Sequence, residues 1–308
     1  MNVPPRPGGT VSRGANEWAC MAKVLRMARD QLTALLFPGQ GSQTADMRET
    51  VERHRPDLLE LAEREVGPDL FDRATEGTRW AQPAIYCAAL AGYAELDASA
   101  DVMAGHSLGE ITALVAAEAI SADDGLRVVA ARGRLMQEAA EETGDGGMTA
   151  VRAREDNREV IAEVAAATHV SIANDNAPDQ LVLSGSLSAL DDAEAQLKER
   201  GVRGKRLPVA GAFHSPLMEP AVEPFRALLA DTPIAEPLVP VYSCVTAEPF
   251  DDVRERLVQA ITHPVRWLEV MRALDARGVT NFVETGPGNV LTNLVRKSLA
   301  GAMEAAGA

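Results

Sequence analysis

Short apolar runs that end in glycine turns recur three times along the chain. Residues 32–37 (LTALLF) lead into Pro-Gly-Gln-Gly, residues 101–104 (DVMA) into Gly-His-Ser-Leu-Gly, and residues 279–283 (VTNFV) into Glu-Thr-Gly-Pro-Gly. The second and third turns are followed by apolar residues at helical spacing. Three strand-turn-helix units of this kind predict an α/β core with a largely parallel sheet.

The pattern changes between residues 142 and 209. The elements predicted there are a strand, a helix, a strand, a helix and a strand, over residues 147–151, 157–167, 180–184, 189–200 and 205–209. This order is typical of a small ferredoxin-like lobe. We therefore expect an N-terminal extension over 1–31, which we expect to be disordered, an α/β core over 32–141 and 210–300, and a small subdomain over 142–209.

The charge balance excludes some classes of partner. The 308 residues include 30 Lys and Arg against 45 Asp and Glu, for a net charge of −15. Nucleic-acid and anionic-membrane binders need basic surfaces, so neither kind of partner is expected. An acidic protein partner would have to find a local basic patch.

Cysteine usage and hydropathy indicate the compartment. Cys20, Cys87 and Cys244 lie far apart and form neither a C-x-x-C pair nor a disulfide framework, which favours a reducing compartment and no structural metal. No apolar run approaches the roughly 18–20 residues of a membrane span, and residues 1–14 do not resemble a secretory signal. The expected location is the cytoplasm.

Residues 105–109 (GHSLG) fit a nucleophile elbow. In such an elbow a serine lies on a tight strand-to-helix turn, and small neighbours allow the backbone to bend so that the hydroxyl projects. The five-residue pattern alone is weak, because an ordinary glycine turn can match it. The strand before it and the helix after it favour Ser107 as a nucleophile.

A serine nucleophile needs a base, and the chain has five histidines. His214 is the best candidate because it lies where the predicted small subdomain returns to the core. The alternative is a histidine that only stabilises a hinge. The other four lie in a charged segment, on the elbow, at the end of an Ala-rich helix and before a proline: His54, His106, His169 and His263.

Residues 37–43 (FPGQGSQ) lack the Gly-Lys-Ser/Thr ending of a phosphate-binding loop. A hydrolase-like elbow pairs the N–H after the nucleophile with an N–H from an earlier strand-end loop. The first would be that of Leu108 and the second that of Gln40, which together would form an oxyanion hole. A plain turn remains the alternative.

Four segments together resemble malonyl-CoA:acyl-carrier-protein transacylase. They are residues 37–43 (FPGQGSQ), 105–110 (GHSLGE), 132–137 (RGRLMQ) and 284–288 (ETGPG), in the order in which that family has them. The resemblance spans about residues 32 to 300. It implies a hydrolase-like α/β core with an inserted ferredoxin-like subdomain.

The same resemblance implies the site and the reaction. Ser107 would be the nucleophile, His214 the base, and the N–H groups of Gln40 and Leu108 the oxyanion hole, while Arg132 would form a bidentate pair with the substrate's free carboxylate. The enzyme would move a malonyl group from malonyl-CoA to the phosphopantetheine thiol of an acyl carrier protein through a seryl ester, for fatty acid or polyketide biosynthesis. It would act as a monomer without a metal or redox cofactor.

Two positions depart from the common family pattern. Many relatives have Gln at the position of Ala260, which suits a contact made by the main-chain carbonyl equally well. Residues 211–214 (GAFH) are similar to discrete acyltransferases that serve polyketide synthases lacking their own. Phe213 would narrow the space beside the substrate's α-carbon.

Two other functions fit parts of the sequence. An acyl hydrolase could use the same elbow, but it normally has an acid between serine and histidine in chain order, and no such acid stands out. A binding module that has lost its chemistry should lack Ser107, His214 or Arg132, and all three are present.

Overall fold

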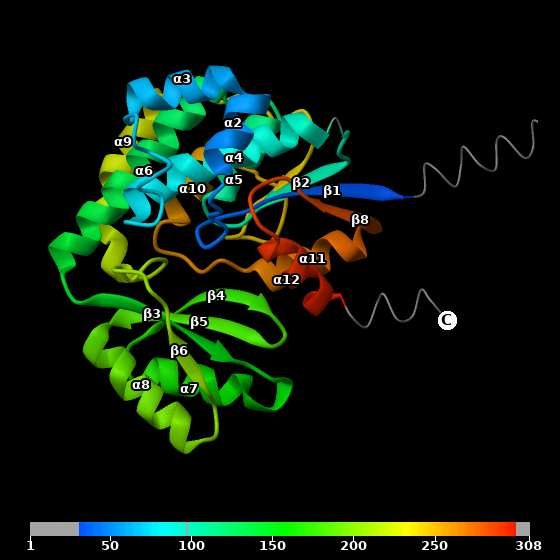
Figure 1. The fold of residues 1–308 in the computed structure, drawn as a ribbon. Helices are drawn as coiled ribbons and strands as arrows, with labels where there is room; N and C mark the ends of the chain where they lie inside the picture. Colours follow the sequence, from blue (N-terminus) through cyan, green and yellow to red (C-terminus); the bar gives the residue numbers. More distant parts are fainter. Residues whose placement is uncertain (1–30, 97, 300–308) are drawn as a thin grey trace, which may run out of the picture.

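The computed structural model describes residues 31–96 and 98–299. The extension predicted for residues 1–31 therefore falls almost entirely outside the described residues. The chain forms two sheets, each covered by helices (Figure 1). No helix in these described ranges is long and apolar enough to cross a membrane.

The first sheet is entirely parallel. Its spatial order is β7-β2-β1-β8, formed by Val241–Tyr242, Val102–Gly105, Leu32–Phe37 and Val279–Glu284. Alternate residues of a strand point to opposite faces, and both faces here are covered. Leu35 and Phe37 join one apolar cluster, whereas Ala34 and Leu36 join another. The predicted α/β fold with a parallel sheet is confirmed.

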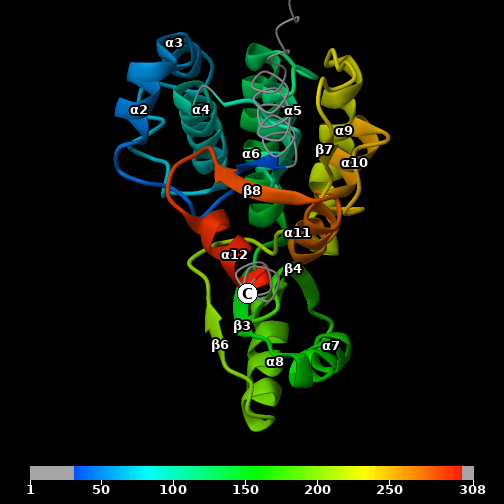
Figure 2. The same ribbon diagram turned by 90° about the vertical axis from the view of Figure 1, so that its right-hand side faces the viewer.

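Two groups of helices cover this sheet, as Figures 1 and 2 show. The larger group comprises α2 (Met47–His54), α3 (Pro56–Glu65), α4 (Thr78–Leu96), α5 (Gly109–Ala116), α6 (Ala122–Thr143), α9 (Val222–Asp231), which follows a 3-10 helix at Pro216–Ala221, and α10 (Val253–Gln259). The other face packs against α11 (Trp267–Ala276) and α12 (Val290–Ser298).

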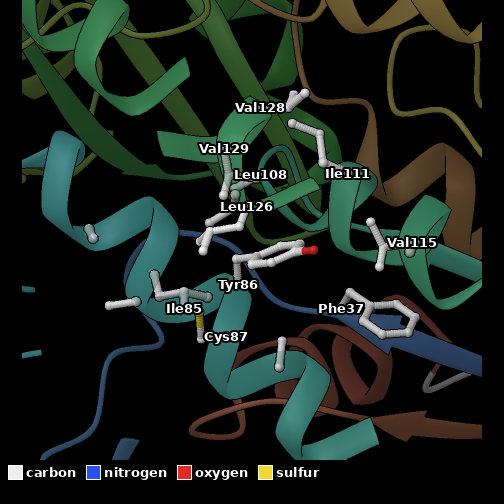
Figure 3. Packing of buried hydrophobic residues seen from close by; sticks show 14 of the residues in the cluster. Phe37, Ile85, Tyr86, Cys87, Leu108, Ile111, Val115, Leu126, Val128 and Val129 are labelled. Carbon is white, nitrogen blue, oxygen red and sulfur yellow. The ribbon is translucent and has the colours of Figure 1, made fainter. Parts of the chain in front are cut away.

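Helices α4 and α6 pack against each other within the larger group. Phe37, Tyr86 and Leu108 lie in the buried cluster drawn in Figure 3. Tyr86 is fully buried, and a buried tyrosine hydroxyl needs a hydrogen-bond partner. Its hydroxyl donates to the carbonyl of Ala122 at 2.7 Å. This bond ties the middle of α4 to the first turn of α6.

The second sheet is antiparallel, with the order β4-β5-β3-β6. Its elements are β3 (Gly146–Arg152), a 3-10 turn (Glu155–Asn157), α7 (Arg158–Ala167), β4 (Ser171–Ala177), β5 (Gln180–Ser186), α8 (Leu187–Glu199) and β6 (Gly204–Arg206). The chain order βαββαβ with this strand order is the ferredoxin-like arrangement.

Strand β4 is absent from the sequence-based prediction. Its sequence, SIANDNA, is rich in Asn and Asp, which are depleted in strands and common in turns. Backbone pairing nevertheless holds it, because it bonds to β5 on one side and to the Val265 segment on the other. Asp175 N donates to Val265 O, and Val265 N donates to Ala173 O, both at 2.9 Å. β4 thus joins the second sheet to the parallel-sheet half.

Candidate active site

Ser107 lies on the turn between β2 and α5, with a left-handed φ of 54°. The end of β1 packs against this turn backbone to backbone, and His106 N donates to Phe37 O at 2.9 Å. A Cβ on Gly109 would lie 2.0 Å from Phe37 O. Only glycine permits this approach, which explains the second glycine of the elbow.

His214 lies beside Ser107, although the two are 107 positions apart. Its Nε2 is 2.8 Å from Ser107 Oγ, and its Nδ1 faces the carbonyl oxygen of His263 at 3.2 Å. Because a carbonyl can only accept, Nδ1 carries the proton and Nε2 is left free to accept one from the serine. His263 therefore contacts the imidazole through its backbone carbonyl, which orients the ring.

Burial keeps His214 neutral. Desolvation, followed by the positive charge of Arg132, lowers the pKa of His214 to about 3. The carbonyls of Ala260 and His263 act in the opposite direction, and the carbonyl of His263 is the one at hydrogen-bond distance. Ala260 therefore faces the imidazole through its main chain. The neutral ring can act as a base across the physiological range.

Arg132 enters the same site from α6 and is 3% exposed. One terminal nitrogen donates to Gln82 Oε1 at 2.8 Å and the other to Ser107 Oγ at 3.2 Å. Desolvation lowers the pKa of Arg132 to about 10, an effect that the carboxyl of Glu110 opposes, so the guanidinium stays charged at neutral pH. A buried positive charge beside a nucleophile is suited to binding an anionic group.

Glu110 is a buried acid whose negative charge raises the pKa of Arg132. Its Oε1 accepts a bond from Cys244 N at 2.8 Å, and burial raises the pKa of the Glu110 carboxyl to about 7. Cys244 Sγ in turn donates to Gly105 O at 3.1 Å. Glu110 and Cys244 together anchor the elbow to the end of β7.

Gln40 and Leu108 line the same cavity as Ser107. A Cβ on Gly39 would lie 2.5 Å from His106 O, so the turn after β1 and the elbow are in close contact. In the described part of the chain, the backbone N–H groups of Gln40 and Leu108 donate to no other residue. Two free donors next to a serine are the arrangement that an oxyanion hole requires.

One cavity of about 430 Å³ lies between the two sheets, and Ser107, His214, Arg132 and Gln82 are among its walls. Every site residue predicted from the sequence is among its walls: Gln40, Ser107, Leu108, Arg132, Phe213 and His214. Phe213 is 8% exposed and lies next to the base in the chain. The second sheet contributes Met148, Asn174, Asn176 and Val182.

The sequence did not identify three polar side chains that support the site. Gln82 holds Arg132, Glu110 opposes its loss of charge, and Asn176 Oδ1 lies 2.8 Å from His106 Nε2. Glu110 belongs to the 105–110 segment (GHSLGE), whereas nothing in the local sequence marks Gln82 or Asn176. The His106 ring also packs on Trp267, with ring centroids 5.4 Å apart. Its contacts with Asn176 and Trp267 therefore give it a structural role, and His214 is the better candidate for the base.

Comparison with known proteins decides the family. Residues 34–308 match the acyl transferase domain. The chain belongs to the acyl transferase family. It is 37% identical to the malonyl CoA-acyl carrier protein transacylase of Bacillus subtilis, over 86% of this chain and 89% of that one.

Two further matches bear on this acyl transferase. It is 41% identical to the polyketide biosynthesis protein ThaF of Burkholderia thailandensis over 89% of its own length, but it spans only a quarter (25%) of that protein. A solved malonyl-transacylase in complex with a type II polyketide synthase acyl carrier protein superposes with a TM-score of 0.80 at 32% identity, covering 88% of this chain and 94% of that one.

We expect Gly109→Ala to destabilise the acyl transferase by about 1–3 kcal/mol or more, because the added methyl overlaps the backbone of β1. Urea unfolding measures this loss. Gly77→Ala is the matched control, because its Cβ would meet only the movable end of the Gln137 side chain. Equal unfolding midpoints for the two variants would contradict the close approach.

We expect His214→Gln to reduce the loss of stability on acidification. In the unfolded chain this histidine takes up a proton near its ordinary pKa of 6.5, whereas in the folded protein it does so only at about 3. Stability therefore falls as pH drops through this window, by about 2 kcal/mol between about pH 7 and pH 5. Urea unfolding of both proteins at the two pH values measures the difference. Glu110 also has a shifted pKa, but it is present in both proteins, so its contribution cancels in the comparison. An equal acid-induced loss of stability in His214→Gln would contradict the lowered pKa of His214 in the folded protein.

Proposed function

We propose that this acyl transferase moves a malonyl group from malonyl-CoA to the phosphopantetheine thiol of an acyl carrier protein. The observation that carries the proposal is the contact of Ser107 Oγ with both His214 Nε2, at 2.8 Å, and Arg132, at 3.2 Å. The first contact activates a nucleophile, and the second places a cation where the free carboxylate of a malonyl group can reach it. The names of the relatives agree with this reaction.

The first half-reaction forms an ester on Ser107. His214 Nε2 takes the hydroxyl proton as Oγ attacks the thioester carbonyl. The N–H groups of Gln40 and Leu108 stabilise the oxyanion of the tetrahedral intermediate. The C–S bond then breaks, and the CoA sulfur receives the proton from His214.

The second half-reaction reverses these steps with a new thiol. His214 takes the proton of the phosphopantetheine thiol, and the sulfur attacks the ester carbonyl of malonyl-Ser107. When the C–O bond breaks, Ser107 Oγ recovers its proton. The overall reaction exchanges one thioester for another of the same kind and is nearly isoenergetic, so we propose that it needs no metal or redox cofactor and occurs in the cytoplasm.

The small subdomain over residues 142–209 would form one wall of the active site. Its side chains Met148 and Val182 are apolar and line the cavity opposite the elbow. We propose that they and Phe213 limit water around the acyl group, and that Phe213 disfavours a branch at the α-carbon. A dry pocket protects a seryl ester from hydrolysis until the carrier thiol arrives.

The environment of the base favours transfer over hydrolysis. A hydrolase with this elbow usually orients its histidine with a carboxylate, whereas His214 Nδ1 faces the carbonyl of His263. The buried carboxyl of this region, that of Glu110, bonds to Cys244 N instead. A histidine oriented by a neutral group is a sufficient base for attack on a reactive thioester.

We expect Ser107→Ala to abolish the malonyl adduct and both half-reactions, because each passes through the same ester. Intact-protein mass spectrometry after mixing with malonyl-CoA measures the adduct. Ser188→Ala, on the exposed surface of α8, is the control and should load normally. A malonyl adduct on the Ser107→Ala protein at the normal rate would mean that another residue is the nucleophile.

We expect Arg132→Ala to lower the specificity constant for malonyl-CoA by roughly two to three orders of magnitude. A carboxylate left unpaired in a buried site costs roughly 3–5 kcal/mol, and about 1.4 kcal/mol is a factor of ten. Acetyl-CoA has no such carboxylate, so its slow transfer should be unchanged or faster. Arg132→Lys should recover only part of the loss, because a point charge cannot replace the planar fork.

Competitive loading with malonyl-CoA and acetyl-CoA measures this preference. Arg134→Ala is the matched control, because Arg134 is on the same helix but is exposed and paired with Glu138 at 3.0 Å. An equal loss with both substrates in Arg132→Ala would show that Arg132 supports the fold and does not read the carboxylate.

A further inference from the structure

A second basic side chain lines the active-site cavity, and it is much more exposed than Arg132. Among the described residues, the cavity walls include two Lys or Arg side chains, Arg132 and Lys297. Arg132 is 3% exposed, whereas the side chain of Lys297 is 43% exposed. The cavity therefore has one cation at its closed end, beside the nucleophile, and another where it opens to solvent.

Lys297 is held across the opening by an ion pair. It is a residue of α12, a helix that lies next to β4 in Figures 1 and 2, and its Nζ is 3.1 Å from Asp179 Oδ2 in the turn between β4 and β5. The Asp179 side chain is 47% exposed. Pairs this exposed contribute little to stability and exchange partners readily. A stronger anion at the opening can therefore displace Asp179 from Lys297.

Both proposed substrates bring such an anion on the same chemical arm. Malonyl-CoA and the carrier protein each present a thiol or thioester at one end of a pantetheine unit, and each has a phosphate at the other end of that unit. With the sulfur at Ser107, the arm must leave the cavity through its open end. One cation there would meet the same phosphate in both half-reactions.

We propose that Lys297 binds the phosphate of the phosphopantetheine arm of donor and acceptor alike, and that Asp179 holds Lys297 in the free enzyme. This inference rests on the proposed function. The net charge of the chain is −15, so an anionic arm is repelled by much of the molecule and benefits from a cation at the entrance. A charge-assisted hydrogen bond to a phosphate oxygen is stronger than the exposed pair that it replaces.

The test compares two substrates that differ only in the phosphate. Malonyl-4′-phosphopantetheine and malonyl-pantetheine are used as donors, and the corresponding thiols as acceptors for malonyl-Ser107. We expect Lys297→Ala to lower the specificity constant about tenfold for the phosphorylated donor and acceptor and to leave both unphosphorylated ones nearly unchanged. Lys297→Arg should retain most of the phosphate effect.

Asp179→Asn separates a phosphate site from a structural link. If Asp179 competes with the phosphate, this variant should raise the specificity constant for the phosphorylated substrates about two- to threefold. If the pair instead holds α12 against the β4–β5 turn, Asp179→Asn and Lys297→Ala should both lower the constants, and equally for all four substrates. That result would overturn the proposal.

Arg296→Ala is the control, because Arg296 neighbours Lys297 on α12 but is absent from the cavity wall. It should leave the ratio between phosphorylated and unphosphorylated substrates unchanged. An equal change of that ratio in Arg296→Ala, or no change in Lys297→Ala, would contradict a specific phosphate contact. A wild-type protein that forms no Ser107 adduct with any donor would instead contradict the proposed function.

Discussion

Arg132 carries a positive charge into the interior, and much of the surrounding structure serves to keep it there. Removing a guanidinium from water is costly unless it is hydrogen-bonded and its charge is opposed. Gln82 and Ser107 accept its hydrogen bonds, and the carboxyl of Glu110 opposes its loss of charge. Burial is the main reason that His214 is neutral, and the charge of Arg132 adds to it, so the group suited to bind an anion also helps to keep the candidate base unprotonated.

The fold was predictable where local pattern and tertiary packing agree. Strand β1 has the predicted bounds, 32–37, because a buried parallel strand must be apolar on both faces. Strand β4 was missed because its stability comes from pairing with β5 and Val265, while its own residues favour turns. β7, with two residues, is held by its neighbour β2 and is too short to leave a periodic signal.

The site was predictable only in part from single residues. Ser107 follows from the elbow, and His214 from its position where the second sheet returns to the core. Arg132 required the resemblance to a family, because its neighbours on the helix, Arg127 and Arg134, are exposed and ion-paired while it alone of the three is buried. Gln82 could not be found at all, since its role depends on the crossing of α4 and α6 rather than on any local spacing.

The chemistry of transfer explains why a carbonyl suffices to orient His214. A carboxylate at Nδ1 would stabilise the imidazolium and raise the pKa of the ring. In the proposed reaction each leaving group is a thiol or the serine itself, and the overall exchange replaces one thioester with another. At His214, burial and the positive charge of Arg132 lower the pKa instead, so the ring is neutral before each attack. The same neutral imidazole can therefore take the proton of the attacking group and return it to the leaving group in both half-reactions of the proposed transfer.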